Sequence, residues 1–159
     1  MTVIWLNGRI GSGKSALGRA LAALLPQARF VDGDDHAGPA HLPNCVRWHM
    51  ALEALLRLAR CRRSLRLVIA YPLEAQGFRR LRAVCGRARR GLLVVNLATP
   101  LPIALRGRGG RTLSLDEQQR VREMFSEDYH RRRFAALTLS NTLPPVSRTA
   151  RMIARRAGF

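Results

Sequence analysis

The only lysine of this chain lies in a glycine-rich segment with the spacing of a phosphate-binding loop. Residues 8–15 read Gly-Arg-Ile-Gly-Ser-Gly-Lys-Ser and match the pattern G-x-x-x-x-G-K-[ST] at every fixed position. Apart from Lys14, all of the 28 lysines and arginines are arginine. A lysine ammonium is a mobile point charge that suits the β- and γ-phosphates of a nucleotide, whereas the planar guanidinium prefers forked contacts. The segment therefore predicts nucleotide binding, with Lys14 at the phosphates.

The residues on either side of this segment supply the strand and the helix that a phosphate loop requires. Residues 3–6 form a short apolar run, and residues 15–25 carry apolar side chains at helical spacing. Backbone N–H groups of the loop and the positive end of the helix dipole would face the phosphates, and the Ser15 hydroxyl is placed to bind Mg²⁺. The predicted nucleotide-binding residues of the loop are Gly8, Arg9, Ile10, Gly11, Ser12, Gly13, Lys14 and Ser15.

Three of the ten acidic residues fall in the short segment Asp32-Gly33-Asp34-Asp35. A kinase that acts on a hydroxyl needs one carboxylate to accept the hydroxyl proton and another to hold the water shell of the metal. We expect Asp32 to serve the metal and Asp34 to accept the proton or position the hydroxyl. The alternative is an Asp/Gly turn with solvated carboxylates, because these residues are common in turns.

Short apolar runs alternate with segments of helical periodicity along the whole chain. Strands are expected at 3–6, 29–32, 65–71, 92–97 and 137–140, and helices at 15–25, 44–60, 74–87, 102–106, 114–132 and 147–156. Asn44 is expected to cap the second helix, and Ser114 with Glu117 forms a capping box for the fifth. This order predicts an α/β fold with a five-stranded parallel sheet, helices on both faces, and a ligand at the carboxyl ends of the strands.

Length, charge and cysteine content limit the classes of function. A chain of 159 residues corresponds to one domain, spanning 1–159, and no apolar stretch approaches the roughly 20 residues that cross a bilayer. Three cysteines without C-x-x-C spacing, and no secretory signal, favour the reducing cytoplasm and no membrane partner. The net charge of +18 makes a nucleic-acid partner possible, but the arginines are dispersed and no basic-aromatic tract occurs, so a small-molecule substrate is favoured.

The acidic segment and the phosphate loop together resemble those of small P-loop kinases. Residues 30–34, Phe-Val-Asp-Gly-Asp, are similar to the Asp-Gly-Asp of gluconate kinases and adenylylsulfate kinases, and shikimate kinases have a related Asp-x-Asp. Arg47-Trp48 and the leucines after it resemble a Trp-initiated helix of gluconate kinase, although the His-Pro that follows the Asp-Gly-Asp there is displaced here. Asp34, His36 and Arg47 are the candidates for substrate contacts, and Trp48 for a core or pocket wall.

The same resemblance points to a lid after the fourth strand. Metabolite and nucleotide kinases carry a mobile segment that brings arginines to the developing phosphate charge, and residues 106–113 are similar to it in position. Arg106 is then a nucleotide contact, and Arg108 and Arg111 are catalytic. A basic loop with no such role is the alternative.

These features together predict a kinase that uses ATP and Mg²⁺ as cofactors and transfers the γ-phosphoryl group to a hydroxyl of a small metabolite. Two alternatives stay open. One is a nucleic-acid or nucleotide kinase, which the positive charge would permit. The other is an antibiotic-resistance or non-catalytic ATP-binding protein, because residues 4–8, Ile-Trp-Leu-Asn-Gly, resemble the start of the loop in resistance proteins of the tunicamycin and chloramphenicol type.

Overall fold

The computed structural model describes all residues except 64, 107–111, 130, 141–144 and 159. Its centre is a five-stranded sheet in the order β2-β3-β1-β4-β5, in which every neighbouring pair is parallel. The strands are β1 (Thr2–Gly8), β2 (Ala28–Asp32), β3 (Arg66–Ala70), β4 (Gly91–Leu97) and β5 (Leu137–Leu139). The predicted α/β fold with a five-stranded parallel sheet is thus confirmed.

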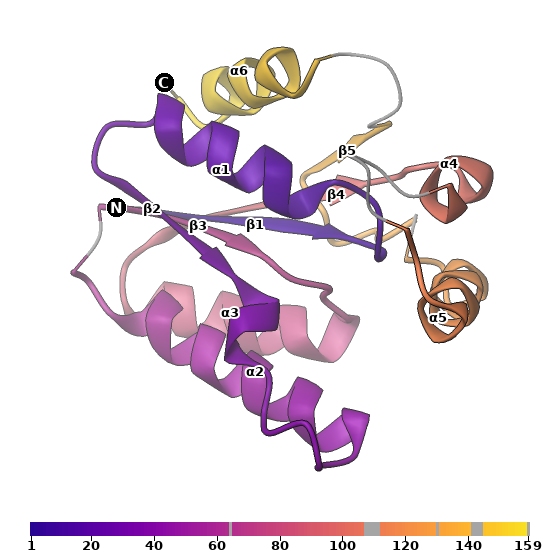
Figure 1. The fold of residues 1–159 in the computed structure, drawn as a ribbon. Coiled ribbons are helices and arrows are strands. Elements are labelled where there is room, and N and C mark those ends of the chain that lie inside the picture. Colours follow the sequence, from indigo (N-terminus) through magenta and orange to yellow (C-terminus); the bar gives the residue numbers. More distant parts are fainter. Residues whose placement is uncertain (64, 107–111, 130, 141–144, 159) are drawn as a thin grey trace.

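Helices cover both faces of this sheet, as Figure 1 shows. The helices are α1 (Lys14–Leu24), α2 (Asn44–Arg60), α3 (Ala75–Arg87), α4 (Leu101–Leu105), α5 (Leu115–Ser126) and α6 (Val146–Arg156), and the 3₁₀ helix η1 spans Gly33–His36. α1 and α6 lie on one face, α2 and α3 lie on the other, and α4 and α5 stand beyond one end of the strands. None of the helices built from described residues is long and apolar enough to cross a membrane.

The central strand β1 divides the core into two clusters because its side chains alternate between the faces of the sheet. Val3 and Trp5 are fully buried in the cluster under α2 and α3, and Ile4 and Leu6 are fully buried in the cluster under α1 and α6. A strand that is apolar on both faces belongs in the middle of a covered parallel sheet. Its carboxyl end is therefore held rigidly, and that end leads into the phosphate loop.

The two predicted functional segments meet at one edge of the sheet. Gly8, at the end of β1, lies opposite Leu97 of β4, and Asp32, at the end of β2, lies opposite Ala70 of β3. All these positions are the carboxyl ends of parallel strands, so the glycine loop and the acidic segment open on the same side.

Several element ends differ from the sequence-based expectation. Asn44 is the first helical residue of α2 and not its cap, because the Pro43 carbonyl already accepts hydrogen bonds from the N–H groups of Val46 and Arg47. α5 ends at Ser126 rather than near residue 132, since Asp128 adopts a left-handed conformation with φ 57°. The acidic segment forms the 3₁₀ helix η1 and not an isolated turn.

Serine 114 closes the first turn of α5 as predicted. Its hydroxyl accepts a hydrogen bond from the Glu117 N–H at 3.2 Å, and the Glu117 carboxylate accepts one from the Ser114 N–H at 3.0 Å. Replacing Ser114 with alanine should therefore lower the free energy of unfolding by about 1 kcal/mol, the usual worth of such a cap. Chemical denaturation of the two proteins measures this, and equal midpoints would show that the cap contributes nothing.

Candidate active site

The loop between β1 and α1 has the backbone conformation of an anion-binding site. Gly11 and Gly13 have φ of 73° and 84°, a left-handed conformation that glycine adopts without strain. Successive N–H groups in such a loop turn towards one point and form a concavity that binds anions. A Cβ at Gly11 would lie 2.8 Å from the carbonyl oxygen of Ala104 in α4, so the close approach of the two segments also requires glycine.

Lys14 and Ser15 occupy the first turn of α1, directly after the loop. The Lys14 ammonium donates hydrogen bonds to the carbonyl oxygens of Gly8 at 3.0 Å and Arg9 at 2.8 Å. Its charge is therefore held against the loop rather than extended into solvent. The start of α1 adds the positive end of the helix dipole to the same place.

Arg9 has a different role from that of the loop residues around it. Its side chain is fully buried, its guanidinium donates to the Thr99 carbonyl, and it lies 4.7 Å from the ring centroid of Phe125 in α5. Burial lowers the pKa of this guanidinium below its ordinary value. The side chain thus joins the predicted phosphate loop to the segment after β4 and to α5.

The acidic segment is fixed by the residue between its carboxylates. Gly33 is buried against the Tyr71 ring, and any Cβ there would overlap the ring atoms. The Asp32 carboxylate accepts a hydrogen bond from the Asp34 N–H at 3.4 Å and caps η1. Asp32 therefore stays at the end of β2, while Asp34 is carried beyond the edge of the sheet.

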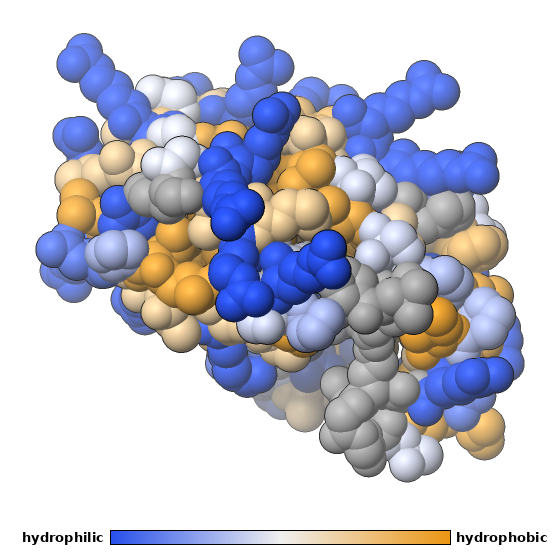
Figure 2. Space-filling view, turned by 90° about the horizontal axis from the view of Figure 1, so that it is seen from above, coloured by the Kyte–Doolittle hydropathy of each residue, from blue (hydrophilic) through white to orange (hydrophobic). Residues whose placement is uncertain are grey.

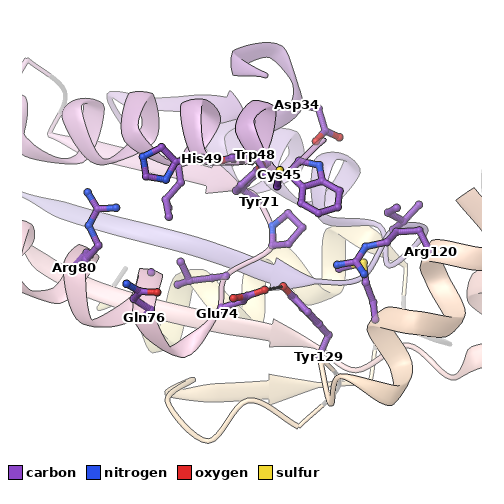
Figure 3. Close-up of a pocket in the computed structure, with 16 residues that line it drawn as sticks. Asp34, Cys45, Trp48, His49, Tyr71, Glu74, Gln76, Arg80, Arg120 and Tyr129 are labelled. Carbon is purple, nitrogen blue, oxygen red and sulfur yellow. Dashed lines mark hydrogen bonds between the residues drawn. The ribbon is translucent and has the colours of Figure 1, made fainter. Parts of the chain in front are cut away.

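A cavity of about 370 Å³ lies between α2, α3 and α5, beside the phosphate loop (Figure 3). Its lining joins one residue of the loop, Ile10, to one residue of the acidic segment, Asp34. The other walls are Cys45, Trp48, His49 and Leu52 of α2, the residues Tyr71, Pro72, Leu73, Glu74, Gln76, Gly77 and Arg80, and Arg120, Met124 and Tyr129. A molecule bound here would lie next to both predicted catalytic segments.

Two tyrosines of this cavity are held in their neutral form. Burial and the negative charge of Asp34 raise the pKa of Tyr71 to about 12. Burial and the hydrogen bond from the Tyr129 hydroxyl to Glu74, at 2.9 Å, raise the pKa of Tyr129 as well. Both groups therefore act as hydrogen-bond donors and carry no charge near neutral pH.

A buried asparagine holds the far wall of the cavity in register. The Asn7 side chain accepts a hydrogen bond from the Leu73 N–H at 2.7 Å and donates one to the Asn96 side chain at 2.8 Å. These contacts bind the segment after β3 to the ends of β1 and β4. The position of Leu73 and Glu74 in the cavity wall follows from them.

The structure brings some of the predicted site residues together and leaves others apart. Asp34 and Trp48 line the cavity, whereas His36 and Arg47 do not, and the Arg47 Nε donates to the Gly38 carbonyl at 3.0 Å. Arg106 is exposed at the end of α4. Arg108 and Arg111, and most of the predicted lid, lie outside the described residues.

Most cavity residues escaped the sequence-based prediction, among them Tyr71, Glu74, Arg120 and Tyr129. Tyr71 carries a usable signal, because it directly follows the apolar run of β3 and so belongs to the carboxyl edge of the sheet. Glu74 lies three residues further along the chain, so its position relative to β3 indicates the same edge of the sheet less directly. Arg120 and Tyr129 have no such signal, because their place depends on how α5 packs.

Solved structures match this chain over almost its whole length, although no protein-family model and no curated protein sequence matches it. A gluconokinase from Sinorhizobium meliloti 1021 is 22% identical with a TM-score of 0.76, and 99% of this chain and 94% of that chain are covered. The APS kinase of Mycobacterium tuberculosis in complex with AMPPNP and APS is 19% identical with a TM-score of 0.73, covering 99% and 98%. This chain has the fold of the P-loop metabolite kinases. The tunicamycin resistance protein of Deinococcus radiodurans shares the fold at 19% identity and a TM-score of 0.64, covering 99% and 96%.

The P-loop fold makes Gly11 a sharp test of the anion site. Replacing Gly11 with alanine forces a side chain into the left-handed region and against Ala104, and should lower the affinity for ATP by about tenfold or more. Gly86 in α3 is the matched control, because a Cβ there meets nothing within 4 Å. Its replacement with alanine should leave ATP affinity unchanged and should preserve or raise stability. Equal ATP affinities of the two variants in calorimetry would contradict the assignment of the loop.

Proposed function

We propose that this protein is a kinase that transfers the γ-phosphoryl group of ATP to a hydroxyl of a small molecule. The observation that carries the proposal is that the cavity is lined by Ile10 of the phosphate loop and by Asp34 of the acidic segment. An acceptor in this cavity has its hydroxyl beside both the phosphate and a carboxylate. The gluconokinase and the APS kinase share this fold, and the AMPPNP bound to the second supports ATP as the donor.

The chain has residues that fit a nucleotide with its Mg²⁺. The left-handed glycines, the Lys14 ammonium and the start of α1 suit the phosphates, and Ser15 and Asp32 are the residues that would hold the metal. Among the described residues no group of three or more acidic, histidine or cysteine side chains converges, which fits a metal held mainly by phosphate oxygens and water. When bound, Mg²⁺ neutralises charge on the β- and γ-phosphates.

Each of these residues has a separate role in the proposed transfer of the γ-phosphoryl group. The acceptor oxygen forms a bond to the γ-phosphorus, and the bond from that phosphorus to the oxygen shared with the β-phosphate breaks. Asp34 takes the hydroxyl proton, and Lys14 with the loop N–H groups stabilises the charge that passes to ADP. Arg106, Arg108 and Arg111 are proposed to close over the phosphates from the segment after α4.

Phosphoryl transfer to defined acceptors tests this proposal. The protein is incubated with Mg-ATP and with three sets of acceptors, namely small hydroxyl metabolites, nucleoside monophosphates and oligonucleotides with a 5′-hydroxyl, and ADP and phosphorylated products are measured. We expect product only with the first set. Product with nucleotides or oligonucleotides would favour the nucleic-acid alternative. ATP binding with no transfer to any acceptor would favour a non-catalytic ATP-binding protein.

A further inference from the structure

The walls of the acceptor cavity are mostly apolar, which bears on the chemistry of the acceptor. Three rings and several aliphatic side chains face it, namely Trp48, Tyr71, Tyr129, Ile10, Leu52, Leu73 and Met124. Trp48 stands at α2 with 44% of its surface exposed, a large share for an indole in the absence of a ligand. Figure 3 shows the indole on the cavity side of its helix, facing Arg120 of α5. A flat apolar body could cover this surface.

Two arginines line the cavity, and carboxylates already pair with both. The Arg80 guanidinium lies 2.5 Å from the Glu53 carboxylate. The Arg120 guanidinium hydrogen-bonds Glu123 at 3.0 Å and Glu127 at 2.8 Å, and it lies 5.0 Å from the ring centroid of Trp48. These are the only arginines or lysines among the described lining residues. Both guanidinium groups therefore already have a carboxylate partner within the chain.

The carboxylates outnumber the cations around this cavity, although the chain as a whole is strongly basic. Two acidic residues line it, Asp34 and Glu74, and three more pair with its arginines. Half of the ten acidic residues of the chain are thus gathered here. Counted in the same way, the arginines number four, because Arg47 acts on Tyr71 and the Arg132 guanidinium lies 3.9 Å from the ring centroid of Tyr129. A ligand without negative charge suits this surface.

Part of the positive charge of the chain is exposed on the side of the sheet away from the cavity. Arg148, Arg151, Arg155 and Arg156 of α6 and Arg19 of α1 are exposed on the face of the sheet opposite α2 and α3. Figure 2, which looks onto that face, shows hydrophilic side chains projecting from it. We therefore infer the charge at the cavity from its lining and not from the net charge of the chain.

The tyrosine hydroxyls of the cavity do not make up for the missing donors. The Tyr129 hydroxyl donates to Glu74 at 2.9 Å, and the Tyr71 hydroxyl donates to the Trp48 carbonyl at 3.5 Å. A small polyhydroxy acid needs several donors and an unpaired cation, because each polar group that is buried without a partner costs free energy. Besides the two paired arginines, the described walls have the side chains of His49 and Gln76 as further polar groups, and most of the remaining lining is aromatic or aliphatic.

From this lining we propose that the acceptor is a hydroxyl compound with a flat apolar ring and no negative charge, rather than a small sugar acid. The inference rests on the proposed kinase function and names the substrate class of the same site. The ring lies against Trp48, and a hydroxyl arm reaches Ile10 and Asp34 beside the phosphates. A cavity of about 370 Å³ holds one such ring with short substituents. A positively charged substituent on the ring would be attracted by the Glu74 carboxylate in the cavity wall.

Four probes of matched size test the proposal by binding alone. They are 4-methylbenzyl alcohol, 4-(aminomethyl)benzyl alcohol, 4-(hydroxymethyl)benzoate and gluconate, titrated into the full chain without nucleotide and followed by ligand-observed NMR. We expect the neutral and cationic alcohols to bind at least about tenfold more tightly than the two anions. Equal or tighter binding of either anion, or no binding of the neutral and cationic alcohols, would overturn the proposal.

Three variants link this preference to the cavity. Trp48→Ala should weaken binding of both favoured alcohols by about tenfold, while Trp48→Phe, which keeps a ring, should retain most of the affinity. Val46→Ala is the matched control, because Val46 is an exposed apolar residue of α2 that does not line the cavity. Equal affinities of Trp48→Ala and Val46→Ala would show that the alcohols bind elsewhere and would overturn the proposal.

One variant, Glu74→Gln, tests the charge preference. The transfer assay then distinguishes a failure of this inference from a failure of the kinase function. Glu74→Gln preserves an acceptor for the Tyr129 hydroxyl but removes the charge, so it should weaken the cationic alcohol severalfold and leave the neutral one unchanged. An unchanged ratio of the two affinities would contradict the charge argument. Transfer to gluconate in the assay above would support the kinase and overturn the ring proposal. Binding of the ring alcohols without transfer to any hydroxyl would support the ring preference of the cavity and overturn the kinase function.

Discussion

Replacing Lys14 with alanine is expected to reduce phosphoryl transfer by about 10²–10³-fold or more, and to weaken ATP binding. The ammonium lies against the carbonyl oxygens of Gly8 and Arg9, inside the loop that the left-handed glycines shape. It is the only lysine of the chain, so no second lysine can take its place. Lys14→Arg should also fail, because the guanidinium is larger and planar. Single-turnover kinetics with labelled ATP measures the transfer step.

Arg19→Ala is the matched control for the charge that this substitution removes. Arg19 is an exposed residue of the same helix, α1, and lies 5.4 Å from the ring centroid of Phe30, away from the loop. We expect its kinetics to match those of the unmodified protein. Wild-type ATP affinity and turnover in Lys14→Ala would refute the assignment of the loop as the nucleotide site.

Replacing Asp34 with asparagine should lower turnover by about 10²–10⁴-fold while ATP affinity stays nearly unchanged. The reason is that the amide keeps the shape of the carboxylate but cannot accept the hydroxyl proton. Asp34 lines the cavity, and its negative charge already acts on the neighbouring Tyr71 hydroxyl. The kinetic constants for acceptor and ATP, measured separately, show whether the loss lies in the chemical step.

Asp35→Asn separates this role from a general need for acidic residues in η1. Asp35 is the next residue, is exposed, and does not line the cavity. Its substitution removes the same charge from the same 3₁₀ helix, and we expect wild-type turnover. Similar turnover in the two variants, whether high or low, would mean that the segment is structural and that the proton has another acceptor.

The sequence was sufficient for the fold because each element carries its own signal. The apolar residues of β1 and the helical spacing after Lys14 predict a strand and a helix, and the glycines between them fix the loop locally. The capping box at Ser114 is equally local, and the structure contains both of its hydrogen bonds. Features that depend on residues within a few positions of one another can be predicted in this way.

Most of the acceptor cavity could not be predicted, because it depends on packing between distant segments. Arg120 contacts the ring of Trp48 only because α5 lies beyond the sheet edge and opposite α2. The hydrogen bond between Tyr129 and Glu74 joins residues 55 positions apart. The side chain of Arg9 shows the same limit, since the motif predicts only that Arg9 belongs to the loop, whereas its burial beside Phe125 depends on the packing of α5.

The most direct test of the central claim follows the γ-phosphoryl group of ATP to its product. The protein is incubated with Mg²⁺, γ-¹⁸O-labelled ATP and a small-molecule extract, and mass spectrometry identifies every compound that gains the label. We predict a new labelled phosphomonoester with the unmodified protein and with Asp35→Asn, formed at least about 100-fold more slowly with Lys14→Ala or Asp34→Asn. Label that appears only in inorganic phosphate, or in the same compounds at the same rate with Lys14→Ala, would contradict a kinase whose acceptor lies between Ile10 and Asp34.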